Sequence, residues 1–179
     1  MKQETFNKLV AKLRSGHDGQ VLEAIDEIGR NGSPEILPEL ARLITKNRNR
    51  EVLSAARTIF FDLKNPESVE VLKSIIDETN DKDTKQVLVA ACWENGLNFS
   101  VQLPFFVDLV LDEDYLISIE AFTVIENMPG PFVNEDVQQC LDTVYSWLDG
   151  PENEGIVNSL LEVLKGFANS GMHNNCIYN

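Results

Sequence analysis

The sequence lacks several features on which common functions depend. Its 179 residues include only two histidines, His17 and His173, and no Gly-rich phosphate loop, nucleophile elbow or His-Glu-x-x-His motif. Histidine is the usual general base near neutral pH, so we expect no catalytic residues, no cofactor and no metal. No apolar run reaches the roughly 18 to 20 residues that span a membrane. These absences argue against an enzyme and against a membrane protein.

Cysteine is also scarce, and its spacing carries no redox or zinc signature. Cys92, Cys140 and Cys176 are an odd number, and no two of them form a Cys-x-x-Cys pair. The N-terminus lacks the apolar stretch of a signal peptide. We therefore expect reduced structural thiols in a cytoplasmic protein.

Positive charge becomes rare along the chain. The formal net charge is −14, and residues 1–50 carry a net +2. Residues 101–179 hold one basic residue, Lys165, against thirteen acidic residues, a net −12. Such an acidic surface argues against binding to nucleic acids or anionic membranes, which requires positive charge.

A two-helix pattern recurs along the chain. Five apolar residues each lie about one turn into an apolar-periodic stretch: Val21, Val52, Val87, Ile117 and Ile156. Three residues before each lies a polar residue typical of helix starts: Asp18, Asn49, Thr84, Asp114 and Asn153. Small residues follow three of them by four positions, namely Ala56, Ala91 and Ala121. Similarity at this spacing predicts an array of helical hairpins.

Apolar spacing and cap residues place the individual helices. We predict helices over residues 4–14, 18–30, 33–46, 49–63, 65–78, 83–95, 100–111, 114–127, 132–148 and 152–168. This gives an all-α fold of about ten helices in four to five repeats. It forms one domain over residues 1–168, with residues 1–16 as an N-terminal capping helix and residues 169–179 as a polar tail. The last helix has no following partner, so we expect its apolar face to be half covered.

Two short phrases resemble the HEAT-repeat superfamily, especially the short bacterial HEAT-like repeats. The first-helix phrase is similar to Asn49-Arg50-Glu51-Val52 with Ala56, and the second-helix phrase to Leu37-Pro38-Glu39-Leu40 and Leu103-Pro104-Phe105-Phe106. The resemblance implies a right-handed α-α superhelix, an ARM-like solenoid, whose second helices line the concave side. The family's Arg after the Val is replaced by Leu22, Leu53, Leu88 and Ser118, which implies more purely apolar stacking between repeats.

Three polar clusters have a functional and a structural interpretation. Lys46–Arg50 could contact a phosphate or an acidic partner, Asp112–Asp114 could hold a divalent cation, and His173–Cys176 could supply two metal ligands. The structural interpretation is favoured for each: charges that complement a helix dipole for the first two, and a polar terminus for the third.

The function that best fits these observations is a non-enzymatic scaffold or adaptor for a protein or peptide partner. The candidate partner-binding residues are off-phase aromatic residues and acids of the second helices: Phe105, Asp108, Asp142, Tyr145 and Asp149. A basic segment is the partner that this acidic C-terminal surface would favour. Two alternatives stay open: an enzyme or accessory factor resembling the HEAT-like phycobilin lyases, and weak head-to-tail association of the chain with itself.

Overall fold

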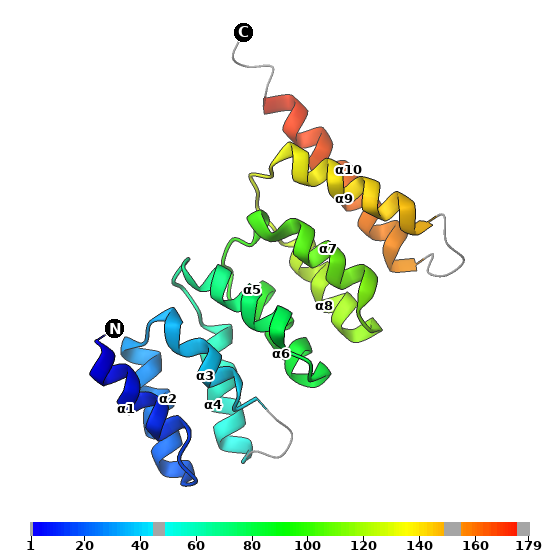
Figure 1. Cartoon of the computed structure of the whole chain (residues 1–179). Coiled ribbons are helices and arrows are strands. Elements are labelled where there is room, and N and C mark those ends of the chain that lie inside the picture. The colour runs from blue at the N-terminus through cyan, green and yellow to red at the C-terminus, as the bar shows by residue number, and fades with distance from the viewer. Residues whose placement is uncertain (1, 45–48, 149–154, 175–179) are drawn as a thin grey trace. The chain divides into compact units, whose positions relative to one another are not determined.

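The computed structural model describes residues 2–44, 49–148 and 155–174 (Figure 1). Within these ranges the chain forms ten α-helices and two short 3-10 turns, and no strand. The predicted all-α class and helix number are confirmed. None of the described helices is both long and apolar enough to cross a membrane. The chain divides into two compact units, Met1–Leu97 and Asn98–Asn179, which are described separately.

The first unit contains six helices in two layers. They are α1 (Gln3–Leu13), α2 (Asp18–Asn31), α3 (Leu37–Ala41, preceded by the 3-10 turn Pro34–Ile36), α4 (Arg50–Phe61), α5 (Ser68–Glu78) and α6 (Lys82–Glu94). Helices α2, α4 and α6 pack side by side in one layer, and α1, α3 and α5 form the other. Their shared interior is aliphatic, with Phe60 fully buried within it.

The second unit contains four helices in the same two-layer arrangement. They are α7 (Leu103–Asp112, preceded by the 3-10 turn Ser100–Gln102), α8 (Tyr115–Glu126), α9 (Asn134–Leu148) and α10 (Gly155–Asn174). Helix α7 packs beside α9, and α8 packs beside α10. Pro38 and Pro104 both lie in the first turn of their helices, α3 and α7, where a missing amide hydrogen costs no hydrogen bond. The two Leu-Pro phrases of the sequence therefore occupy the same position in their helices.

The prediction of a half-covered final helix is wrong. Helix α10 packs extensively on the helix before it, α9, just as α8 packs on α7. Leu160, Leu161 and Leu164 are all buried, and Phe167 stacks on Phe132 with 4.0 Å between ring centroids. A hairpin therefore closes the C-terminal end of this unit. In this unit the hairpins join the second helices α7 and α9 to the first helices that follow them, α8 and α10, a pairing that the sequence periodicity does not reveal.

Two of the five repeat positions are one residue off. Val21, Val52 and Ile117 are buried as predicted, whereas Val87 and Ile156 are half-buried and their neighbours Leu88 and Val157 occupy the core. In α6 the cause lies at the cap: Asp81, not Thr84, begins the helix, since its carboxylate accepts the Thr84 amide hydrogen at 2.9 Å. The helix therefore starts earlier than predicted.

Two helix lengths also differ from the prediction. The helix expected over residues 33–46 is a 3-10 turn followed by α3, which ends at Ala41; residues 45 and 46 lie outside the described residues. Conversely, α10 continues to Asn174, so the prediction of a polar tail from residue 169 places the end of the last helix too early. No proline interrupts the chain between residues 169 and 174. That residues 1–168 form a single domain with residues 1–16 as its cap stays a prediction.

Side-chain hydrogen bonds also link successive repeats of the first unit. Asn49 donates through Nδ2 to Asp18 Oδ2 at 2.9 Å, which joins two equivalent helix starts. Thr84 donates through Oγ1 to the carbonyl of Ile44, and Asn95 Nδ2 donates to the carbonyl of Phe60 at 3.5 Å. Stacking between these repeats is therefore not exclusively apolar, and the expectation that it is more purely apolar than in the HEAT-repeat superfamily stays a prediction.

Candidate partner-binding surface

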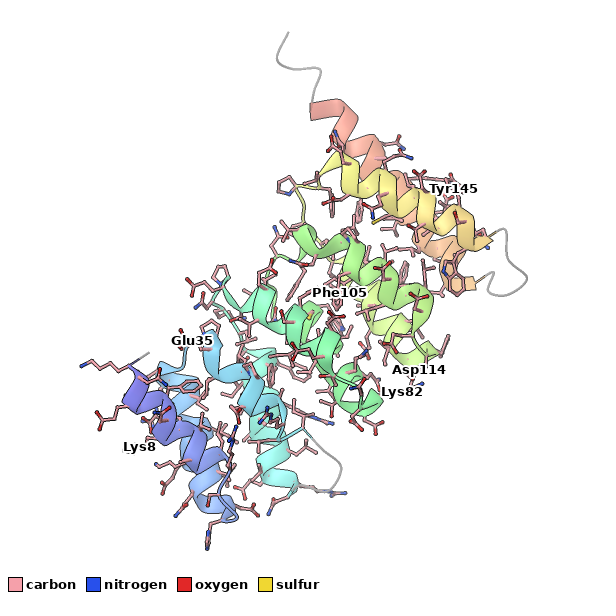
Figure 2. All side chains as sticks on the ribbon, in the orientation of Figure 1. Lys8, Glu35, Lys82, Phe105, Asp114 and Tyr145 are labelled. Carbon is pink, nitrogen blue, oxygen red and sulfur yellow. The ribbon has the colours of Figure 1, made fainter. Side chains whose placement is uncertain are left out.

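Helices α7 and α9 carry four of the five predicted partner-binding residues. Phe105 and Asp108 lie three positions apart on α7, and Asp142 and Tyr145 lie three positions apart on α9 (Figure 2 labels Phe105 and Tyr145). Asp149 lies outside the described residues. Because α7 and α9 are neighbours in one layer, the fold brings these residues onto adjacent helices. We call this layer the α7–α9 surface.

Phe105 belongs partly to the core. Its ring meets Phe106 edge-to-face, with 5.3 Å between centroids and 74° between planes, and Phe106 in turn meets Phe99 at 5.7 Å. Phe106 is fully buried, whereas Phe105 is half-buried. Such aromatic pairs stabilise a fold by about 0.5 to 1.5 kcal/mol beyond their buried area. Phe105 therefore has a structural role even if its exposed edge also meets a partner.

Asp108 lies within an acidic cluster, defined as Asp108, Asp112 and Asp136. Partial burial, and after it the charge of Asp112, raises the pKa of Asp108 above its ordinary value. Burial raises the pKa of the Cys140 thiol to about 12, with smaller contributions from Asp108 and Asp136. Within the described parts of the chain no cation pairs with any of the three carboxylates. The cluster is thus a site of uncompensated negative charge.

The second half of α9 has one exposed face, opposite its buried Leu141 and Val144. Asp142 is exposed and accepts a hydrogen bond from Gln138 Nε2 at 3.0 Å, and both residues border a shallow hollow along the helix. The Tyr145 side chain is 47% exposed. Lys165 of α10 is a cation near Tyr145. Its hydrogen bond to Glu162 is the main cause of its raised pKa, and the smallest contribution to that shift comes from Tyr145. Because Lys165 is paired with Glu162 at 2.9 Å, it leaves the acidic character of the surface unchanged.

The other sequence candidates have the roles that follow from their positions. Asp114 begins α8, and its carboxylate accepts the amide hydrogen of Ile117 at 3.4 Å, which favours the structural interpretation of Asp112–Asp114. Among the described residues no three His, Cys, Asp or Glu side chains gather as metal ligands would. Most of the Lys46–Arg50 cluster and half of the His173–Cys176 segment lie outside the described residues.

Sequence reasoning missed an apolar patch on α8. Tyr115, Leu116 and Ile119 are 71%, 55% and 36% exposed, although large apolar side chains are normally buried. The sequence does contain a signal for this patch, because α8 carries apolar residues on more than one face. A helix needs only one apolar face to cover a core. A helix of this kind has apolar surface left over for a second contact.

Two layers of paired helices, linked by repeat-to-repeat hydrogen bonds, define a helical-repeat protein. The family model for HEAT repeats matches residues 6–93. Residues 6–93 therefore belong to the HEAT-repeat family, and HEAT repeats imply a helical solenoid. HEAT repeats are commonly scaffolds for protein interactions. No curated protein matches the chain.

Proposed function

We propose that this protein is a non-enzymatic cytoplasmic adaptor that binds a basic segment of a protein partner on the α7–α9 surface. The observation that carries the proposal is the acidic cluster. After burial, Asp112 contributes to the raised pKa of Asp108, and Asp108 and Asp136 both contribute to that of Cys140, yet no cation of the described residues pairs with these carboxylates. A partner with lysine or arginine side chains would relieve this repulsion on binding.

Charge gives such a complex its selectivity and its association rate more than its affinity. Apolar contacts supply most of the affinity, and Tyr145 is the exposed aromatic residue closest in sequence to Asp142. We therefore propose that the carboxylates of Asp108 and Asp142 align the basic segment, with Tyr145 as its apolar anchor. Asp149, seven positions after Asp142 in the sequence, is a further candidate for the same role.

The test measures binding of a fluorescein-labelled, lysine- and arginine-rich peptide by fluorescence anisotropy at several salt concentrations. Asp108→Asn should weaken binding by about two- to fivefold at low salt, the effect of one partly exposed charge. Glu126→Gln is the matched control: it removes one charge from an exposed residue of α8, in the other layer. Equal losses in both variants, or no binding of the basic peptide at low salt, would contradict the proposal.

A second copy of the chain is a competing partner, because residues 1–50 carry a net +2 and residues 101–179 a net −12. Sedimentation velocity at the same salt concentrations separates the two cases. Self-association that rises as salt falls would favour the head-to-tail contact, and a monomer throughout would leave the partner protein as the ligand of this surface.

A further inference from the structure

The first unit contains a cavity of about 250 Å³. It lies where α2 and α4 end and α5 begins, and its apolar wall is formed by Ile28, Leu37, Ile59 and Leu63. Gly29 lets α2 approach α4 closely at this wall, because a Cβ there would meet Ile59 Cδ1 at 3.0 Å. Pockets for drug-sized ligands measure roughly 300–1,000 Å³, so this cavity suits a ligand of about one amino acid.

Ser68 gives the cavity a polar group that the fold leaves unused. The side chain is 1% exposed, and in the described part of the chain its Oγ has no hydrogen-bond partner. Buried hydroxyl groups in native proteins almost always have a partner, so each exception requires an explanation. Ser68 also begins α5, an eleven-residue helix whose N-terminus favours negative charge.

Two charged residues, Lys64 and Asp62, line the same cavity. Lys64 donates through Nζ to the carbonyl of Asn95 at 2.9 Å, its one interaction among the described residues, which leaves two of its three hydrogens for a ligand. Asp62 also lines the cavity, and both side chains belong to residues that are exposed. The cavity therefore combines an apolar wall, a buried hydroxyl, a cation and a carboxylate.

We propose that this cavity binds an aliphatic amino acid residue with a free α-carboxylate. The carboxylate accepts hydrogen bonds from Lys64 Nζ and Ser68 Oγ, and the aliphatic side chain packs on Ile28, Leu37 and Ile59. A free amino acid and the C-terminal residue of a chain share this chemistry. They differ at the nitrogen, where only a free amino acid offers an ammonium group to Asp62.

The test is a titration of the full ¹⁵N-labelled chain, followed by NMR at the amides of Gly29 and Gly32, which both line the cavity. L-Leucine should shift these amides and saturate, whereas L-leucinamide, which lacks the carboxylate, should not. Saturation by N-acetyl-L-leucine as well supports a C-terminal residue as the ligand, and binding of L-leucine alone supports a free amino acid. No saturable shift with either carboxylate, or equal binding of L-leucinamide, overturns the proposal.

Variants then assign the contacts. Ser68→Ala should weaken L-leucine binding by about five- to tenfold, and Lys64→Gln by about tenfold or more. Lys8→Gln, the same change at an exposed lysine of α1, should leave binding unchanged. Ser68→Ala removes an unpartnered buried hydroxyl, so its melting temperature should equal or exceed that of the wild type. A lower melting temperature, or unchanged binding, would show that the hydroxyl serves the fold and not a ligand.

Because this cavity lies in the first unit, its test is independent of the acidic surface. Loss of the peptide interaction in Asp108→Asn leaves L-leucine binding intact if both proposals hold.

Discussion

Asn95 offers the sharpest test of how polar side chains hold the first unit together. It is 2% exposed and follows the last residue of α6. Its Oδ1 accepts the amide hydrogen of Leu97 at 2.8 Å, and its Nδ2 donates to the carbonyl of Phe60, which lies 35 positions earlier on α4. Asn95→Ala removes both bonds and leaves two backbone groups without their partner.

The magnitude follows from the burial of those groups. A buried polar group that loses its partner costs about 1 to 3 kcal/mol. The bond to Phe60 is long at 3.5 Å, so it belongs at the lower end, and the bond to Leu97 at 2.8 Å near the middle. We expect Asn95→Ala to lower the free energy of unfolding by about 2 to 4 kcal/mol, a large part of the roughly 5 to 15 kcal/mol of a typical domain.

Urea unfolding measures this change through tryptophan fluorescence. The chain has two tryptophans, Trp93 in the first unit and Trp147 in the second, so Trp147→Phe leaves Trp93 as the reporter of the first unit. Asn7→Ala is the control, since Asn7 is exposed and, within the described ranges, its side chain bonds only to Gln3; it should change the free energy by less than about 0.5 kcal/mol. If Asn95→Ala stays within that same margin, the buried asparagine contributes nothing net and the argument for polar links between repeats is refuted.

Two further predictions concern the α7–α9 surface. Burial and the charge of Asp112 raise the pKa of Asp108, so its ionised form destabilises the fold. This destabilisation is absent at pH values below the pKa of Asp108 in the unfolded chain, and it is complete at pH values above the raised pKa in the folded protein. Asp108→Asn should therefore be more stable than the wild type at pH 7, by about 0.5 kcal/mol given its exposure to solvent, with the gain lost near pH 3 in urea titrations. Phe105→Ala should lower the free energy of unfolding by at least about 1 kcal/mol through lost packing on Phe106, whereas Tyr145→Ala should leave it within about 0.5 kcal/mol and weaken peptide binding. Equal stability losses in both aromatic variants would contradict this assignment of roles.

The helices could be predicted from the sequence because their signals are local. Asn49 and Asp114 begin helices as predicted, since a side-chain oxygen next to an apolar-periodic stretch satisfies amides only a few residues away. Where two capping residues compete, local signals are ambiguous. Asp81 and Thr84 are both good caps; Asp81 caps α6, and Thr84 lies inside the helix, where its hydroxyl donates to the carbonyl of Ile44, forty positions away. Contacts of that separation leave no trace in a short window.

The two candidate sites differ in what the sequence could reveal about them. The acids and aromatics of α7 and α9 are visible by helical phase, but their relation to Cys140 depends on how the two helices pack. The cavity at Ser68 gave no signal, since a serine in the first turn of a helix is ordinary capping chemistry. Its hydroxyl is unusual because Asn65 caps this turn, accepting the amide hydrogen of Glu67 at 3.0 Å, while the buried Ser68 Oγ has no hydrogen-bond partner among the described residues.

The distribution of exposed apolar side chains limits how tightly the proposed surface can bind. Among the described residues of α7 and α9, Tyr145 is the one large apolar side chain that is strongly exposed, and Phe105 is committed in part to Phe106. Interfaces draw most of their affinity from a few such anchors, while charges exposed at the rim contribute little and are screened by salt. A basic segment on this surface should thus bind weakly, with a strong dependence on salt and on Tyr145. The larger apolar patch, Tyr115, Leu116 and Ile119, lies on α8 in the other layer. A partner that binds tightly would therefore have to contact α8 as well, and charge reversal on α9 alone would slow its association without abolishing the complex.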